Sequence, residues 1–222
     1  MGNFRDGLDA AVGSEGGGQW GFWFFKGNQS LRTDKHGATV DRPKALLTAP
    51  KNWPALKDTI FADGPIDASV YSGGNNYWLF RGNQALRTDG YTINKEMKDI
   101  TADSHWPALK GTVFADGVDA AVESGSGGKD GFWFFKGDKT ARTDKHGAVL
   151  DEGVGDITGP DLWPVLKDTI FAKGPIEAAL YSGGGWYWLF KGNQTVKTNG
   201  NEIRGRISDI AAKPNWPALS DQ

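Results

Sequence analysis

The chain has 222 residues, of which 38% are apolar and 12% aromatic, and this composition supports a sizeable buried core and argues against disorder. Its 25 basic and 27 acidic residues give a net charge of -2, and this balance offers no polybasic footprint for nucleic acid or an anionic membrane. Because the chain has no cysteine, a disulfide framework, a thiolate zinc site and a cysteine nucleophile are also excluded. The 32 glycines and 10 tryptophans instead predict many short strands joined by tight turns.

Three motifs recur four times along the chain. The pattern Trp-[Phe/Leu]-Phe-[Lys/Arg]-Gly recurs every 55 residues and begins at Trp23, Trp78, Trp133 and Trp188. A Trp-Pro pair follows each copy, at Trp53, Trp106, Trp163 and Trp216. An acidic residue between an aliphatic residue and an alanine precedes each copy, at Asp9, Asp67, Asp119 and Glu177. Four copies of one structural unit therefore account for the whole chain.

The third copy shows the elements of a unit in chain order. Residues 118–122 predict a short apolar strand, and a Gly/Ser loop at 125–128 leads to an aromatic strand at 132–135. That strand is apolar on both faces, so it must be covered on both. Gly137-Asp138 predicts a hairpin turn to a strand at 141–144, and an outer strand follows near 156–158. A helical turn begins at Trp163-Pro164 and is expected to be capped by the side chain of Asp161. The equivalent caps in the other units are Asn52, Ser104 and Asn215.

Four small sheets covered by copies of themselves predict an all-β, four-bladed β-propeller with a short helical turn ending each blade. A linear solenoid would need polar capping units at its ends, whereas here Phe4 matches the internal Phe114 and the last Trp-Pro matches the internal ones. We expect one propeller over residues 1–222, with blades at approximately 4–57, 61–110, 114–167 and 171–222. A second period of 110 residues links blades one and three, and blades two and four, so sites built on loops should occur in pairs.

The motifs resemble those of the hemopexin-like family. The resemblance is carried by residues 114–122, 132–138, 142–144 and 163–166, and by their equivalents in all four units. It implies a four-bladed propeller, but the family includes haem carriers, protease exosite domains, plant seed albumins and lectins. The ring-closing disulfide common in the family is impossible here, and Arg32, Arg87 and Arg142 are followed by Thr where aromatic neighbours are usual. These departures favour the cysteine-poor plant albumin and lectin type.

The resemblance also implies a central channel that holds structural ions. Calcium or sodium would be bound by the backbone carbonyls of Asp9, Asp67, Asp119 and Glu177. A second ring, with chloride nearby, would be formed by Ala11, Ser69, Ala121 and Ala179. Converging strand ends leave carbonyls unpaired, and oxygen ligands suit a hard cation. The alternative is that the acids only begin strands and contact solvent.

Two tryptophans lie outside the repeated positions and are candidates for ligand binding. Trp20 and Trp186 follow the glycine-rich stretches 16–18 and 183–185, where an exposed indole could stack on a sugar or another planar ligand. The alternative is a ring folded onto its own loop. The loops of the second and fourth units add further candidates, which are Tyr71, Asn75, Asn76 and Tyr181.

No catalytic motif is present, and the three histidines offer little support for a Ser-His pair or for haem ligation. His36 and His146 belong to opposite blades, so they cannot share one metal. We therefore expect a non-catalytic protein, with glycan binding as the leading hypothesis. The alternatives are a carrier of haem or polyamine at the channel mouth, and a protein-interaction or defence module.

No apolar run approaches the roughly 20 residues that span a bilayer, so membrane insertion is not expected. The first residues lack the apolar stretch of a signal peptide. Together with the resemblance, this predicts a cytoplasmic or seed-storage location.

Overall fold

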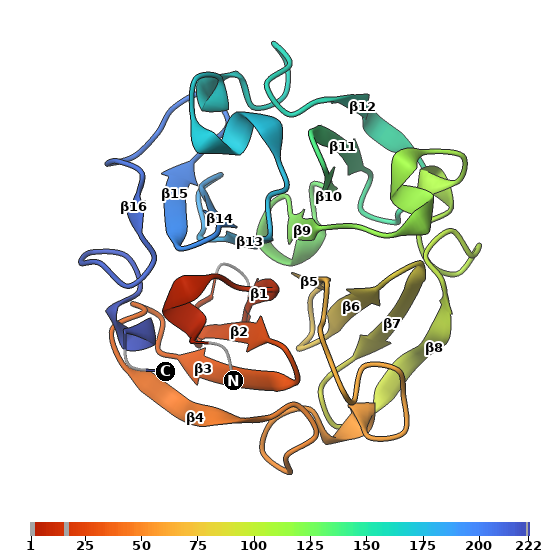
Figure 1. Ribbon diagram of the computed structural model, residues 1–222. Helices are drawn as coiled ribbons and strands as arrows, with labels where there is room; N and C mark the ends of the chain where they lie inside the picture. The colour runs from red at the N-terminus through yellow and green to blue at the C-terminus, as the bar shows by residue number, and fades with distance from the viewer. Residues whose placement is uncertain (1–2, 16–17, 221) are drawn as a thin grey trace.

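The computed structural model describes residues 3–15, 18–220 and 222, and these form four antiparallel sheets around a central axis (Figure 1). The first sheet contains β1 (Ala10–Gly13), β2 (Phe22–Lys26), β3 (Gln29–Thr33) and β4 (Val40–Leu46). The second contains β5 (Ala68–Tyr71), β6 (Tyr77–Arg81), β7 (Gln84–Thr88) and β8 (Ile93–Asp99). The third contains β9 (Ala120–Glu123), β10 (Phe132–Lys136), β11 (Lys139–Thr143) and β12 (Leu150–Asp156). The fourth contains β13 (Ala178–Tyr181), β14 (Tyr187–Lys191), β15 (Gln194–Thr198) and β16 (Ser208–Asp209).

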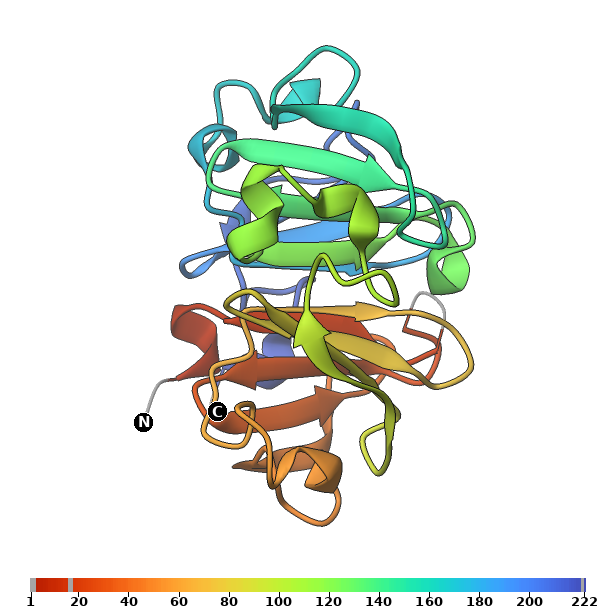
Figure 2. The same ribbon diagram turned by 90° about the vertical axis from the view of Figure 1, so that its right-hand side faces the viewer.

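The predicted all-β four-bladed propeller is thus confirmed. Within each blade the strands pair in chain order, from an inner strand at the axis to an outer strand at the rim. In Figure 2 the ring is seen from its side, with the strands running across its thickness. Short 3-10 turns connect the strands, namely η1 (Phe4–Asp6), η2 (Pro54–Leu56), η3 (Pro107–Leu109), η4 (Val113–Asp116), η5 (Ser126–Gly128), η6 (Pro164–Leu166), η7 (Ile170–Lys173) and η8 (Pro217–Leu219). Among the described residues, no helix has the length and apolarity to cross a bilayer.

The hydrophobic core consists of four clusters, one at each seam between neighbouring blades. The tryptophan of each Trp-Pro pair lies at the centre of a seam. Trp53, for example, is 1% exposed and packs edge-on against Trp23 of its own blade and Tyr77 of the next, at centroid distances of 5.2 Å in both cases. Burying so large a ring between two blades makes each seam a major source of stability.

A backbone hydrogen bond repeats at every seam and closes the ring. The residue after each Trp-Pro pair donates its N–H to a glycine carbonyl between the third and fourth strands of the next blade. The four bonds are Ala55 to Gly90 (3.1 Å), Ala108 to Gly147 (3.0 Å), Val165 to Gly200 (3.3 Å) and Ala218 to Gly37 (3.1 Å). The last of them joins blade four to blade one, and Phe4 N–H also donates to the Gln222 carbonyl at 3.0 Å. The ring therefore closes without a covalent bond.

The expected side-chain caps of the Trp-Pro turns were wrong. The N-cap residue is the tryptophan itself, and no side chain caps η2, η3, η6 or η8. Asn52 instead donates its Nδ2 to Ser30 Oγ at 3.0 Å, and Asn215 donates to the Asp209 carbonyl at 2.8 Å. Both amides therefore hold the residue before the turn to a strand of its own blade.

Candidate functional site

Four acidic side chains surround one mouth of the axis. Asp9, Asp67, Asp119 and Glu177 each directly precede an inner strand, and each carboxylate accepts a hydrogen bond from a glycine N–H in the hairpin turn between the second and third strands of its blade. The donors, in the same order, are Gly27 (2.5 Å), Gly82 (2.7 Å), Gly137 (2.7 Å) and Gly192 (2.7 Å). The acids therefore fix the turns at this mouth as well as placing negative charge there.

These acids line a cavity of about 610 Å³ that Asp6 and Asp116 also border. Two lysines, Lys26 and Lys136, are the basic residues in its lining. Lys26 is already engaged, because its Nζ donates to the Gly7 carbonyl at 2.6 Å. Burial raises the pKa of Asp67, and the negative charges of Asp9 and Asp119 add to that rise. A cation in this cavity would relieve the repulsion.

The backbone around the axis suits a hard cation better than the side chains do. Each inner strand is the last strand of its sheet, so its free edge, with unpaired carbonyls, faces the other inner strands, β1, β5, β9 and β13 (Figure 1). Within the described residues, no three His, Asp or Glu side chains form a metal-binding group. Oxygen ligands from the backbone are what calcium or sodium would take here.

Ser69 strengthens this fit. Its side chain is 2% exposed, and its Oγ has no hydrogen-bond partner in the described part of the chain. The other three blades have alanine at this position, namely Ala11, Ala121 and Ala179, and all are buried. A buried hydroxyl without a partner is costly, so an ion or water that uses this oxygen would remove the penalty.

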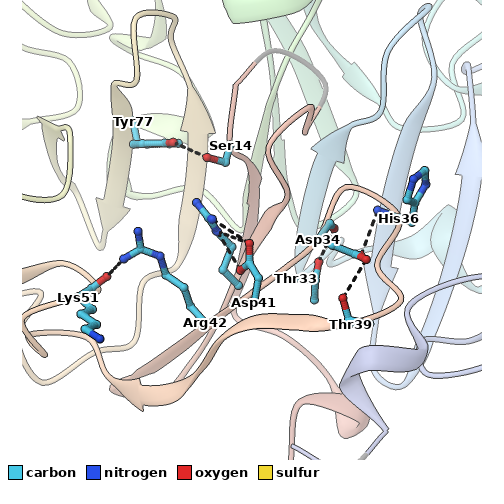
Figure 3. Close-up of polar contacts among 10 residues, drawn as sticks. Ser14, Thr33, Asp34, His36, Thr39, Asp41, Arg42, Lys51 and Tyr77 are labelled. Carbon is cyan, nitrogen blue, oxygen red and sulfur yellow. Dashed lines mark hydrogen bonds and ion pairs between the residues drawn. The ribbon is translucent and has the colours of Figure 1, made fainter.

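The glycine-rich loops between the first and second strands lie at the other end of the inner strands. Trp20 is 62% exposed in the loop of blade one, and the glycines at 16 and 17 lie outside the described residues. The start of this loop is tied to blade two, because Ser14 Oγ and the Tyr77 hydroxyl are hydrogen-bonded at 3.2 Å (Figure 3). The same bond joins blades three and four, where the Tyr187 hydroxyl donates to Ser124 Oγ at 3.4 Å. The loops are therefore held across the seams in pairs.

The remaining candidate residues differ in exposure. Trp186 is half-buried, and the guanidinium of Arg204 lies 5.6 Å from its ring centroid. Asn75 is exposed in a left-handed conformation with φ of 57°, and its Oδ1 accepts from the Tyr77 hydroxyl. Asn76 is half-buried, and its Nδ2 donates to the Gly74 carbonyl at 2.8 Å.

Tyr71 and Tyr181 support these loops from below. Both rings are buried and pack at 5.5 and 5.6 Å against Tyr77 and Tyr187 respectively. The hydroxyl of Tyr181 accepts the Gly185 N–H at 3.3 Å. Sequence reasoning had grouped them with the ligand-binding candidates, and their burial gives them a positioning part in the loop.

The histidines occupy three separate places. His36 lies in an exposed turn closed by Asp34 (Figure 3), and His146 lies in the matching turn of blade three. Burial favours the neutral form of Asp34, but hydrogen bonds from the turn outweigh it and lower the pKa of this carboxyl. His105 is buried, with Nε2 3.1 Å from the Ala85 carbonyl, and burial lowers its pKa. His105 and His146 both border the cleft between blades two and three, whereas His36 lies apart in blade one.

Comparison with known proteins gives curated relatives over about half of the chain and solved structures over nearly all of it. No family model matches it. It is 36% identical to Albumin-2 of Lathyrus sativus over 136 residues, which cover 56% of this chain and 57% of that protein. The chain thus spans little more than half the length of this curated relative.

Solved structures match over nearly the full length. A 2S albumin seed protein from Dolichos is 28% identical, with a TM-score of 0.82 over 97% of this chain and 98% of its own. The hemopexin fold protein CP4 from cow pea is 26% identical, with a TM-score of 0.80 over 96% of both chains. A plant lectin with two metal binding sites from Cicer arietinum is 28% identical, with a TM-score of 0.82 over 96% of both chains.

Proposed function

This chain has the hemopexin fold and resembles the plant albumins and lectins, and we propose that it is a non-catalytic glycan-binding protein. The observation that carries the proposal is the exposed indole of Trp20, 62% accessible, on a loop that a rigid propeller holds in place. A flat apolar ring on a fixed loop suits the CH face of a sugar. Support comes from the solved relative of similar fold that is described as a lectin.

Trp186, Asn75 and Asn76 complete the proposed glycan surface. They lie on the corresponding loops of blades four and two, on either side of the loop that bears Trp20. Asn75 is exposed and so can offer its amide to sugar hydroxyls, which form good hydrogen bonds with such groups. Tyr71 and Tyr181 would hold the loops without touching the sugar.

A glycan array with matched variants tests the proposal. We expect the unaltered protein to bind one class of saccharide, and Trp20→Ala to weaken binding at least about tenfold because the stacking face is lost. Trp186→Ala should weaken it less, since that ring is already half covered. The control is Val149→Ala, which removes an apolar side chain that is 60% exposed in the third blade. Melting temperatures should stay unchanged in all three. A blank array, or equal binding by all variants, would refute the glycan site.

A second candidate function is binding of a polyamine at the acidic mouth. Six acidic side chains line that cavity, and burial, with a contribution from the charges of Asp9 and Asp119, raises the pKa of Asp67. A linear polycation could neutralise several of them at once. Spermine titration by calorimetry tests this, with the double variant Asp6→Asn/Asp116→Asn against the single control Asp58→Asn. Weaker binding in the double variant alone supports the site, and equal binding in both variants contradicts it.

Calcium or sodium, with chloride nearby, is proposed as a structural ion set of the axis. A ligand that binds only the folded state raises its stability by mass action. Calcium should therefore raise the melting temperature, and a chelator should lower it again.

A role as a haem carrier or as a protein-interaction module stays an alternative, and a Soret shift is the test of haem binding. In line with the seed albumin from Dolichos, a seed-storage location is part of the proposal.

A further inference from the structure

One outer-strand position changes its charge from blade to blade. In each blade the last threonine of the third strand pairs with a residue of the outer segment, which is Val40, Ile93, Leu150 or Ile203 in blade order. The position whose charge changes is the next residue along the chain. The residues at this position are Asp41, Asn94, Asp151 and Arg204, in blade order. The first and third blades thus have an acid where the second and fourth have a neutral or a basic side chain.

In the first and third blades this acid neutralises an arginine of the third strand. Arg32 binds Asp41 through two nitrogens, with Nε at 3.0 Å and Nη2 at 2.8 Å from the carboxylate oxygens of Asp41. Arg142 lies 3.9 Å from Asp151 and 4.0 Å from Glu152. Arg32 and Arg142 therefore each lie beside an acid of the outer strand.

In the second blade the equivalent Arg87 has no such partner. Its Nε donates to Ser72 Oγ at 3.0 Å, and no ion pair joins it to an acid among the described residues. It lines a cleft of about 400 Å³ at the seam between blades two and three. Lys95 borders the cleft from blade two, and Lys129 and Lys145 border it from blade three, while none of the described residues in its lining is acidic.

The fourth blade, on the opposite side of the ring, has a second cationic cleft, lined by residues of that blade. Lys197 replaces the arginine and lines a cleft of about 650 Å³ together with Arg204, Arg206 and Lys213. This lining, too, contains no acid within the described part of the chain. Burial lowers the pKa of Lys197, and of Arg87 in the other cleft, which reflects cations held partly out of water without a counter-charge.

We propose that these two clefts bind anions, specifically the phosphate or sulfate groups of a ligand that carries two or more of them. Four cationic groups around one cleft exceed what a single oxyanion needs, and a multiply charged ligand would pair with several of them. Each cleft brings together a half-buried cation, Arg87 or Lys197, and exposed cations able to close over the ligand. Their 110-residue spacing gives two sites per chain, on opposite blades.

This site is separate from the proposed glycan surface around Trp20. Trp186 lies against Arg204 of the fourth-blade cleft. Trp20, on which the glycan proposal rests, lines neither cleft. The two proposals can therefore fail independently. Trp20→Ala should leave anion binding unchanged.

Titration calorimetry with tripolyphosphate and with a sulfated heparin hexasaccharide tests the proposal at low ionic strength. We expect a stoichiometry of two per chain, with affinity that falls as salt is added. Lys95→Gln/Lys145→Gln should remove one site, and Arg204→Gln/Lys213→Gln should remove the other, each raising the Kd of its site at least about tenfold. The control is Lys57→Gln/Lys167→Gln, which makes the same change in net charge at exposed residues outside both clefts.

The probes also separate the two sources of the anionic group. Binding of the sulfated hexasaccharide but not of tripolyphosphate assigns the clefts to sulfated glycans, and the reverse assigns them to phosphorylated small molecules. A desulfated hexasaccharide should not bind. The proposal is overturned if neither polyanion binds, or if the control pair lowers affinity as much as the cleft pairs do.

Discussion

The glycines that contact the seam tryptophans offer a sharp test of how the ring is held together. A Cβ at Gly147 would lie 2.5 Å from Cε3 of Trp106, whereas a Cβ at Gly90 would lie 3.4 Å from Cε3 of Trp53. The backbone has φ of 69° at Gly147 and 94° at Gly90, so an alanine is strained at both positions, and the backbone strain at Gly90 is at least as large. The left-handed conformation costs about 1–2 kcal/mol for a residue with a Cβ. Displacing a packed indole adds about 1–3 kcal/mol at Gly147 only.

We therefore expect Gly147→Ala to lower the free energy of unfolding by about 2–5 kcal/mol, and Gly90→Ala by about 1–2 kcal/mol. Gly37→Ala should match Gly147→Ala, because its Cβ would lie 2.4 Å from Cε3 of Trp216 at the seam that closes the ring. Urea denaturation followed by circular dichroism measures all three, with equal m-values as the check that unfolding stays cooperative. If Gly90→Ala proves as destabilising as Gly147→Ala, backbone strain dominates and the packing argument for the seams is refuted.

Two further substitutions test the axis and the buried histidine. Ser69→Ala should stabilise the protein in chelator by about 1 kcal/mol, because a buried hydroxyl without a partner is removed. It should also reduce the rise in melting temperature that calcium gives. A loss of stability both in chelator and in calcium would contradict this prediction. Because burial lowers the pKa of His105 from 6.5, the unfolded chain binds more protons below that pH, so stability should fall as the pH drops from 7 to 5. His105→Asn places at this position the residue found at Asn52 and Asn215 in other blades, and it should reduce the dependence of the unfolding free energy on pH. Urea denaturation at several pH values measures this, and an unchanged pH dependence would show that His105 is not its source.

The blade pattern was predictable because its strongest signals are large side chains at fixed spacing. Trp133 and its neighbours form a strand apolar on both faces, and only coverage by two other blades can bury such a strand. The outer strand was harder to place. It was expected near 156–158 but is β12 at Leu150–Asp156, which contains two glycines and pairs with β11 through an irregular register. Exposed rim strands have little hydrophobic pattern, so composition does not locate them.

The site residues were predictable by position but not by the part each plays. The acid of each inner strand was found from its repeat, yet nothing in the sequence indicates that the carboxylate of Asp119 accepts the N–H of Gly137 across the blade. Tyr71 was grouped with the ligand-binding candidates. It pairs directly with Tyr77 on the neighbouring strand, so the two rings lie on the same face of the sheet and pack against each other. The alternating charge at Asp41 and Asn94 was visible in the four copies, but it gains meaning only once the pairing to Arg32 and Arg87 is known.

The duplication of two blades explains where this propeller can vary. Every seam uses the same tryptophan, glycine and backbone hydrogen bond, as at Trp106, Gly147 and Ala108, so a change there strains the ring. The rim carries no such constraint, because the side chain at the position of Asn94 or Arg204 is exposed and contributes to no seam. The absence of the rim acid from blades two and four therefore changes the charge of the rim without changing the fold. It leaves a pair of uncompensated cationic clefts that face away from each other across the axis, an arrangement suited to bridging two anionic ligands or two groups of one extended ligand.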